Sequence, residues 1–316
     1  MELQDPYNRK FKALRVSLLN TCNFQCVYCT MGSEDGEDVD HRPQQTAAFF
    51  LKQITKLHQH LALENVRLTG GEPLLYRELP ELIKGIAEIG VKEIKLTTNG
   101  FLLEKQAESL KKAGLKAVNI SLDAIDEEVF YRMSKRRQVA KVFRGIDAAI
   151  ANGLEVKLNA VIMKNHNEHQ ILPLLNYAFE KNIPIRFLEV MAMGHLHQNH
   201  EDYIFKQQQI LEIFSSTYSL SRVIRKKSAT ANYWETHTGQ TFGIIANESA
   251  PFCQDCNRLR MDHAGNLYGC LSVNQGFYFD EQIDEESLKQ TLQKTMQQKQ
   301  LLKFTGSTLS MLKIGG

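Results

Sequence analysis

Six cysteines fall into two groups of three that lie near opposite ends of the chain. The first group has the spacing CxxxCxxC, and the second begins with CxxC. An odd number of thiols in each group disfavours a disulfide framework and favours bound metal, because thiolates are strong ligands of zinc and iron. The six are Cys22, Cys26, Cys29, Cys253, Cys256 and Cys270.

Two kinds of metal site fit such triplets. A closed zinc site needs a fourth ligand, for which the sequence offers nearby histidines such as His263. An iron-sulfur cubane needs no fourth side chain, because three thiolates hold three irons and the fourth iron stays open to a ligand that is not protein. Spacing alone leaves both kinds open, but an open iron position would indicate a catalytic site.

Strands and helices alternate along the chain and predict the scaffold for these sites. Short β-branched runs are separated by amphipathic stretches, such as 47–62, where Phe50, Ile54, Leu57 and Leu61 share one helical face. Consecutive βα units with right-handed crossovers form a parallel sheet, so the fold class is α/β. We predict an incomplete (β/α)6 parallel barrel rather than an open doubly wound sheet. Its strands are expected at 14–19, 66–73, 94–100, 117–123, 156–163 and 185–194.

Residues suited to ligand binding follow these strands at their carboxyl ends, where barrels of this kind place their chemistry. Glycines there let the backbone approach a ligand closely, and a carboxylate such as Glu72 suits an ammonium group. Any one of these residues alone would also fit a turn, a helix cap or a core position. Their common position at the strand ends is what supports a ligand-binding site. The set is Gly70, Gly71, Glu72, Pro73, Thr97, Thr98, Asn99, Ser121, Asp123, Met191 and Met193.

Composition narrows the function classes. The chain has 316 residues, of which 43 % are apolar and 23 % charged, as in globular enzymes. Its net charge of +2 calls for neither nucleic acid nor membrane as a partner. No apolar run approaches the roughly 20 residues that span a bilayer, and the start, MELQDPYNRKFK, has no signal core. We therefore expect a cytoplasmic enzyme.

The motifs together resemble a known family. CxxxCxxC with a tyrosine before its last cysteine, followed by GGEP, is similar to the radical S-adenosylmethionine (SAM) superfamily. LRVS, LTTNG, NISLD, IRFLEVMAMG, PFCQDCNRLR and the terminal IGG further resemble the GTP 3′,8-cyclase family, whose members are lyases of molybdenum cofactor biosynthesis. These matches run from Arg15 to Gly316, nearly the whole chain.

The resemblance implies two 4Fe-4S clusters, one on each cysteine triplet, and SAM on the open iron of the first. Reductive cleavage of SAM would give a 5′-deoxyadenosyl radical that takes hydrogen from the ribose 3′ carbon of GTP, which then attacks guanine carbon 8. The product would be (8S)-3′,8-cyclo-7,8-dihydroguanosine 5′-triphosphate. SAM is implied to contact Tyr28, Gly70, Gly71, Glu72, Ser121 and Met191.

The same resemblance implies positions for the substrate and for catalysis. Arg258 and Arg260 are two apart, so on an extended strand both guanidiniums point to one side, which suits a triphosphate. Arg15, Arg258, Arg260 and the tail residues Gly315 and Gly316 are implied in catalysis. The implied GTP contacts are Arg15, Arg67, Thr97, Lys157, Arg258 and Arg260.

Two regions and several partners complete the expectation. Residues 1–220 would form the SAM barrel, and 221–316 the auxiliary-cluster region that closes it and ends in the Gly-Gly tail. The resemblance implies a reductase or flavodoxin-type electron donor and a downstream pyranopterin-forming enzyme, and it admits a homodimer. The chain departs from the usual family pattern at Asn20 and Thr21, where Asp-Arg is common, and at Asn65, where lysine is common.

Two alternatives remain beside the cyclase. A radical SAM enzyme with one auxiliary cluster could modify a peptide or another small molecule, although NRLR and the Gly-Gly end argue against it. A zinc protein that only binds a nucleotide is disfavoured by the motifs at the strand ends.

Overall fold

A curved sheet is the centre of the molecule. The computed structural model describes residues 3–30 and 44–315, and in these ranges eleven strands pair in the order β11-β10-β1-β2-β3-β4-β5-β6-β9-β8-β7. The strands are β1 Ala13–Ser17, β2 Asn65–Thr69, β3 Glu93–Thr98, β4 Ala117–Ser121, β5 Glu155–Ile162, β6 Ile185–Glu189, β7 Leu220–Val223, β8 Asn232–Thr236, β9 Thr241–Ile245, β10 Arg258–Met261 and β11 Leu267–Tyr268.

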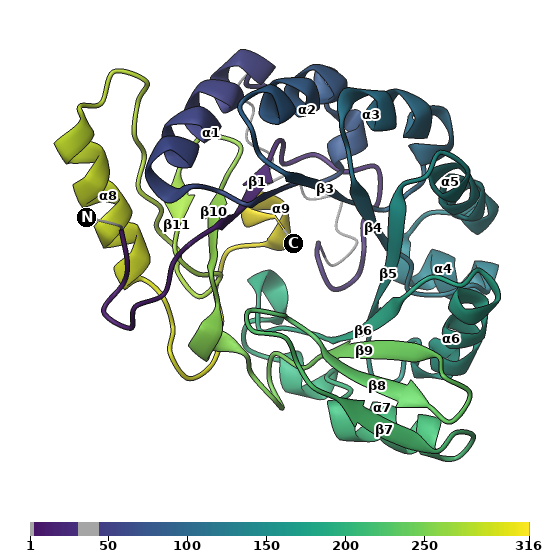
Figure 1. The fold of residues 1–316 in the computed structure, drawn as a ribbon. Coiled ribbons are helices and arrows are strands. Elements are labelled where there is room, and N and C mark those ends of the chain that lie inside the picture. The colour runs from purple at the N-terminus through teal and green to yellow at the C-terminus, as the bar shows by residue number, and fades with distance from the viewer. Residues whose placement is uncertain (1–2, 31–43, 316) are drawn as a thin grey trace.

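Strands β1 to β6 are parallel and follow one another in chain order, so the predicted incomplete barrel is confirmed. Helices lie along the outside of the curve, and the sheet does not close (Figure 1). In the described ranges no helix is long and apolar enough to cross a membrane. The helices are α1 Ala47–Leu61, α2 Leu79–Glu88, α3 Ala107–Ala113, α4 Glu127–Ser134, α5 Val139–Ala151, α6 Ile171–Glu180, α7 Gln207–Ser215, α8 Glu285–Gln297 and α9 Met311–Ile314.

Helix α1 shows why these segments fold as they do. Thr46 caps its first turn by accepting a hydrogen bond from the Phe49 backbone N–H at 3.2 Å. The predicted apolar face is buried, which confirms the helix that the spacing indicated, and packs its side chains against the sheet. Its buried apolar residues are Ala47, Phe50, Ile54, Leu57 and Leu61.

Side-chain alternation gives the sheet an apolar outer face and a polar inner face. The strand register joins Val16, Leu68, Leu96, Val118 and Val156 into one buried row in the main hydrophobic core. Because successive residues point to opposite faces, the neighbours of this row in sequence face the interior of the curve.

The chain after β6 extends the sheet at both edges. Strand β9 pairs parallel with β6, and β10 pairs parallel with β1, so two segments distant in sequence flank the six predicted strands. Strands β7, β8 and β11 lie antiparallel at the outer ends. We did not predict these additions, because edge pairing of short strands depends on the finished sheet more than on local alternation.

The carboxyl terminus returns into the curve of the sheet. Figure 1 shows α9 within the arc, near β1 and β10. The Gly194 N–H donates to the carbonyl oxygens of Ser307 and Leu309, at 3.0 and 3.1 Å, which ties the approach to α9 to the loop after β6. The tail is therefore placed beside the carboxyl ends of the strands.

Candidate active site

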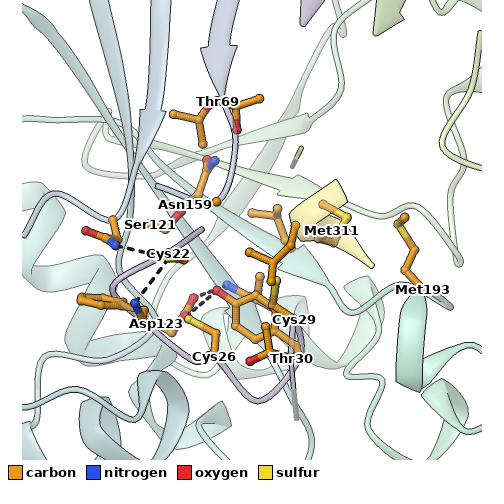
Figure 2. A pocket seen from close by; sticks show the side chains of 18 of the residues that line it. Cys22, Cys26, Cys29, Thr30, Thr69, Ser121, Asp123, Asn159, Met193 and Met311 are labelled. Atoms are coloured by element: carbon orange, nitrogen blue, oxygen red, sulfur yellow. Dashed lines mark hydrogen bonds between the residues drawn. The ribbon is translucent and has the colours of Figure 1, made fainter. Parts of the chain in front are cut away.

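The loop after β1 turns its three cysteines toward one cavity. The N–H groups of Cys29 and Thr30 donate to the Cys26 carbonyl oxygen at 2.8 and 3.0 Å, and the Phe24 N–H donates to the Cys22 sulfur at 3.4 Å. Figure 2 shows the three cysteines beside one another, between Asp123 and Met311. The cavity has a volume of about 200 Å³.

This first cavity carries negative charge and no positive charge. Of the described residues that line it, none is Lys, Arg or His, whereas Glu72, Asp123 and Glu189 are acidic. Burial raises the pKa of Cys22 and of Cys29 to about 12, and burial with a contribution from Asp123 raises that of Cys26 well above its usual value. Three thiolates here need a positively charged group to stabilise them, which a metal cluster supplies.

The two carboxylates beside the cysteines join the strand ends to one another. Glu72 is 1 % exposed and accepts hydrogen bonds from the Leu74 N–H, the Thr98 hydroxyl and the Asn99 N–H, at 3.0, 2.6 and 2.8 Å. Burial raises its pKa to about 7. These contacts hold the ends of β2 and β3 together, and the contact of Glu72 with an ammonium group stays a prediction.

Asp123 connects the end of β4 to β5 and to the cysteine loop through hydrogen bonds. Its two oxygens accept hydrogen bonds from the Tyr28 hydroxyl at 2.9 Å and from the Val161 N–H at 2.8 Å. Burial raises the pKa of Asp123 to about 6. Tyr28 is thereby fixed at the cavity wall, which also includes Ser121 and Met191.

Gly70 and Gly71 pass close to the backbone of the cysteine loop. The Gly71 N–H donates to the Leu19 carbonyl oxygen at 2.7 Å, and a Cβ on Gly71 would lie 2.0 Å from the Thr21 carbonyl oxygen. Any larger residue at 71 would force the loop away from β2, so glycine is needed for the approach itself. Both glycines line the first cavity.

The second triplet lines another cavity, of about 190 Å³. Cys253 and Cys256 lie in one turn, closed by a 3.2 Å hydrogen bond from the Cys256 N–H to the Cys253 carbonyl oxygen, and Cys270 follows β11. His263 does not line this cavity. In the described ranges no three His, Cys, Asp or Glu side chains surround a single metal position.

Three arginines line the second cavity in a row that the strand register fixes. Arg15 on β1 lies opposite Arg67 on β2 and Arg260 on β10. Burial and the neighbouring guanidiniums lower the pKa of Arg15 well below its usual value, and burial lowers those of Arg67 and Arg260 to about 9 and 10. The Arg15 Nε atom is buried without a hydrogen-bond partner. Such a row needs an anion to be stable.

The other residues predicted to contact GTP differ in whether they line the second cavity. Thr97 lines both cavities and accepts a 3.3 Å hydrogen bond from Arg67 Nη1. Lys157 is half-buried on β5 and lines neither cavity, although burial and Arg186 lower its pKa. Arg258 lines the second cavity and donates to the Ser228 carbonyl oxygen at 3.1 Å.

The two cavities adjoin, and the tail lies between them. Arg260 Nη1 donates to the Gly315 carbonyl oxygen, whereas Gly316 lies outside the described residues. Met311 and Leu312 reach the first cavity. The residues that line both cavities are Thr97, Asn159, Leu188, Met191, Asn247 and Met311.

Comparison with known proteins agrees with this arrangement. Residues 16–202 match the radical SAM superfamily, and residues 183–304 match Molybdenum Cofactor Synthesis C. The GTP 3′,8-cyclase of Staphylococcus epidermidis is 36 % identical over 282 residues, which cover 87 % of this chain and 83 % of that protein. The chain belongs to the GTP 3′,8-cyclase family of the radical SAM superfamily. The cyclases of Staphylococcus haemolyticus and of a Synechocystis species are 37 % and 35 % identical over 285 residues, with the same coverage.

Solved structures extend the likeness of fold. SuiB of Streptococcus suis, bound to the precursor peptide SuiA, superposes with a TM-score of 0.66 at 16 % identity, covering 88 % of this chain and 65 % of SuiB. The enzyme anSMEcpe with bound AdoMet superposes with a TM-score of 0.53 at 19 % identity, covering 65 % of this chain and 60 % of its own. At these identities the likeness shows a shared fold.

Two cations that line the second cavity were missing from our sequence prediction for this cyclase-family chain. Arg186 on β6 donates from Nε to Asn159 at 2.9 Å, and its Nη2 atom is buried without a hydrogen-bond partner. Lys299 lies just beyond α8, with Nζ 3.2 Å from the Cys256 sulfur. Arg186 is the second residue of a buried strand that begins directly after Pro184. That signal was available in the sequence, whereas nothing around Lys299 in sequence distinguishes it from a surface lysine.

The departures from the usual family pattern lie at the start of the first cysteine loop and at the start of β2. Asn20 is 6 % exposed at the start of the cysteine loop, and Asn65 begins β2 opposite Ala13 and Glu93. Neither these residues nor Thr21 line either cavity. These replacements therefore change no charge among the described residues that line the two cavities.

Proposed function

We propose that this protein is a radical SAM GTP 3′,8-cyclase, a lyase that converts GTP into (8S)-3′,8-cyclo-7,8-dihydroguanosine 5′-triphosphate in molybdenum cofactor biosynthesis. The observation that carries the proposal is a pair of adjoining cavities, each with three free thiols, of which one is acidic and the other strongly basic. SAM carries a sulfonium and an ammonium group and fits the acidic cavity, whereas a triphosphate fits the basic one.

The first triplet would hold a 4Fe-4S cluster through Cys22, Cys26 and Cys29. When bound, the cluster would supply the one electron that cleaves SAM into methionine and a 5′-deoxyadenosyl radical. The chain's own contribution is to orient SAM with backbone at Gly70 and Gly71 and with the cavity-wall residues. The contact residues proposed there are Tyr28, Gly70, Gly71, Glu72, Ser121 and Met191.

The second triplet would hold the auxiliary 4Fe-4S cluster and place guanine beside it. In the proposal Arg15, Arg67 and Arg260 bind the triphosphate from one row, and Arg186 joins them. Each charge-assisted hydrogen bond contributes roughly 1.5 to 3 kcal/mol, and the anion also relieves repulsion among the arginines. Thr97, Lys157 and Arg258 complete the proposed GTP contacts.

The tail is proposed to support the later chemistry. Gly315 has φ +73°, a conformation that glycine adopts readily, and a Cβ there would lie 2.7 Å from Thr69 Cγ2. Its carbonyl oxygen holds Arg260. Gly315 would thus fix a substrate-facing arginine without occupying the space of the substrate, and a supporting role of Gly316 is proposed from the family resemblance.

The proposed cluster sites assign different roles to the two regions of the chain. Residues 1–220 are proposed to form the SAM-cleaving barrel, and 221–316 the auxiliary-cluster region. Each turnover consumes one electron to cleave SAM and a second electron, with a proton, to reduce the cyclised nucleotide radical. A reductase or flavodoxin-type donor is therefore required, and a pyranopterin-forming enzyme is proposed to take the product. Location in the cytoplasm fits these partners. A homodimer, which the family admits, is tested by sedimentation of the purified protein.

One anaerobic experiment tests the proposed activity. The reconstituted protein is assayed for iron and sulfide and incubated with SAM, dithionite and each nucleoside triphosphate, and products are identified by mass. We expect about eight irons per chain, one 5′-deoxyadenosine per cyclised guanosine triphosphate, and no cyclised product from ATP. Cleavage of SAM without a nucleotide product would show that the radical enzyme acts on a substrate other than GTP. Bound zinc without sulfide would refute the proposed radical SAM activity.

A further inference from the structure

We propose that Lys299 is a positioning residue of the second cluster site, which keeps a cationic hydrogen-bond donor on the Cys256 sulfur and thereby raises the reduction potential of the cluster bound there. The inference rests on the proposed function only in that the second triplet binds a 4Fe-4S cluster. It is independent of the identity of the substrate.

The three sulfurs of this triplet have unequal surroundings. Lys299 Nζ and Arg258 Nη2 each lie 3.2 Å from the Cys256 sulfur. In the described ranges no such donor reaches the sulfur of Cys253 or Cys270. Cys256 therefore differs from its two partners, and from all three cysteines of the first triplet, in having two cationic donors.

Lys299 is held under Cys256 by the amino-terminal segment of the chain. The Lys299 N–H donates to the Met296 carbonyl oxygen at 3.1 Å, which makes a turn at the end of α8, and Nζ lies 5.5 Å from the centre of the Phe11 ring. An aromatic face at that distance stabilises an ammonium group. The cation thus has a built site and is not a freely moving surface charge.

Arg9 connects this turn to the turn of the cysteines. Its Nη1 atom donates to the carbonyl oxygens of Cys253 at 2.9 Å and of Gln300 at 3.2 Å, and its guanidinium is paired with buried Asp5. One side chain therefore fixes both the loop that carries Cys256 and the residue after Lys299. This explains how the distance between Nζ and sulfur is maintained over 43 residues of sequence separation.

The two donors to the Cys256 sulfur differ in their other hydrogen-bond acceptors. Arg258 divides its guanidinium between Cys256 and the Ser228 carbonyl oxygen, and in the proposed function it also contacts the triphosphate. Lys299 donates to the sulfur itself. If GTP draws Arg258 away, Lys299 is the donor that stays with the cluster.

A donor on a ligating sulfur affects the potential in a definite direction. Reduction adds one negative charge, and a nearby cation with a hydrogen bond to the thiolate stabilises the reduced form more than the oxidised form. Loss of the ammonium group should therefore shift the midpoint potential of this cluster to a more negative value.

The test is a redox titration, followed by electron paramagnetic resonance, of the full-length protein with both clusters loaded. Its first cluster, identified by the change of its signal on addition of SAM, is the internal reference. In Lys299→Met we expect the second signal to titrate at a more negative potential while the first is unchanged. Lys299→Arg should titrate close to the wild type, because it keeps the charged donor.

Lys303→Met is the matched control, since Lys303 is exposed and only four residues further along. It should leave both potentials unchanged. A Lys299→Met protein that holds about eight irons and titrates like the wild type would overturn the proposal. Wild-type protein with only four irons would instead contradict the proposed function.

A second measurement decides the matter if Lys299→Met does not load its second cluster. Wild-type protein labelled with ¹⁵N-lysine is examined by pulsed resonance for a nitrogen coupled to the reduced second cluster. We expect one such coupling, and its loss in Lys299→Arg grown with the same label. Absence of the coupling in the wild type would show that the ammonium group does not contact the cluster, and the proposal would fail.

Discussion

The two cysteine sites have the same number of thiols but opposite electrostatic surroundings. In the first, burial raises the pKa of every cysteine, and the charged residues lining the cavity are carboxylates. In the second, burial raises the pKa of Cys256, but Lys299 and Arg258 outweigh it and lower that pKa to about 6. In the proposed function the cysteines hold the clusters, and the surrounding charges would select the second ligand of each site.

In the proposed function this difference also gives the two sites different roles. An acidic cavity favours the cationic SAM and makes an added electron less stable, as required of a cluster that gives its electron away. A basic cavity favours an anionic substrate and stabilises negative charge. Variants that act on one site and spare the other therefore test the comparison directly.

Cys26→Ala should have the largest effect, because it removes a thiolate that only this cluster uses. We expect complete loss of 5′-deoxyadenosine formation, with about four irons retained at the second site. The mirror variant, Cys256→Ala, should still cleave SAM but make no cyclised nucleotide. Deoxyadenosine formed by Cys26→Ala would show that the first triplet has been misassigned.

Arg15→Met should weaken GTP binding while stabilising the free protein. Loss of a charge-assisted contact, roughly 1.5 to 3 kcal/mol, corresponds to an increase in Kd of about ten- to a hundredfold. Removal of one charge from the row should raise the unfolding free energy by about 1 kcal/mol, or Tm by a few degrees. Equilibrium dialysis and calorimetry measure both.

Arg137→Met is the control for that variant, because Arg137 is paired with Glu128 on the surface. It should leave GTP affinity unchanged. An Arg15→Met protein that binds GTP normally would make the row structural and leave the anion to other residues.

Gly315→Ala should reduce the cyclised product about tenfold, since a side chain in this conformation costs about 1 to 2 kcal/mol and overlaps Thr69. Iron content and SAM cleavage should stay normal, because the first site does not use this residue. Product and deoxyadenosine are quantified together. A proportional loss of both would indicate general damage instead.

Thiol reactivity in the iron-free protein should distinguish the sites by pH. Cys256 becomes a thiolate above about pH 6, and Cys253, whose pKa burial raises to about 11, stays protonated at neutral pH. The lower nucleophilicity of the acidic thiolate offsets part of this, so at pH 7.5 Cys256 should react about tenfold faster with a disulfide probe. Equal rates, measured by mass of the labelled peptides, would contradict the assigned surroundings.

Tyr28→Phe should have the smallest effect. It removes the hydrogen bond to Asp123, worth about 1 kcal/mol, and should raise the Kd for SAM roughly fivefold. Tyr131→Phe, at a half-exposed tyrosine, is the control. A Tyr28→Phe protein with normal SAM affinity would leave Asp123 without a measurable part in the first site.

The parallel barrel and the grouping of residues at its strand ends were predictable because both rest on local patterns. Alternation along β1 put Arg15 on the face opposite Val16, and the register then brought it beside Arg67 and Arg260. That β10 would be the strand next to β1 was not predictable, since it joins residues more than two hundred positions apart. Arg260 joins the arginine row only through that pairing.

The sequence by itself determined the ligands and the scaffold: two thiol triplets, strand-end motifs and a six-unit parallel barrel, all encoded in spacing over a few residues. Only the tertiary structure decided the charge of each cavity. Lys299 reaches Cys256, and the Gly315 carbonyl oxygen meets Arg260, across contacts that depend on where α8 and the tail pack. Electrostatic surroundings sum over residues from distant segments, so no local pattern can specify them.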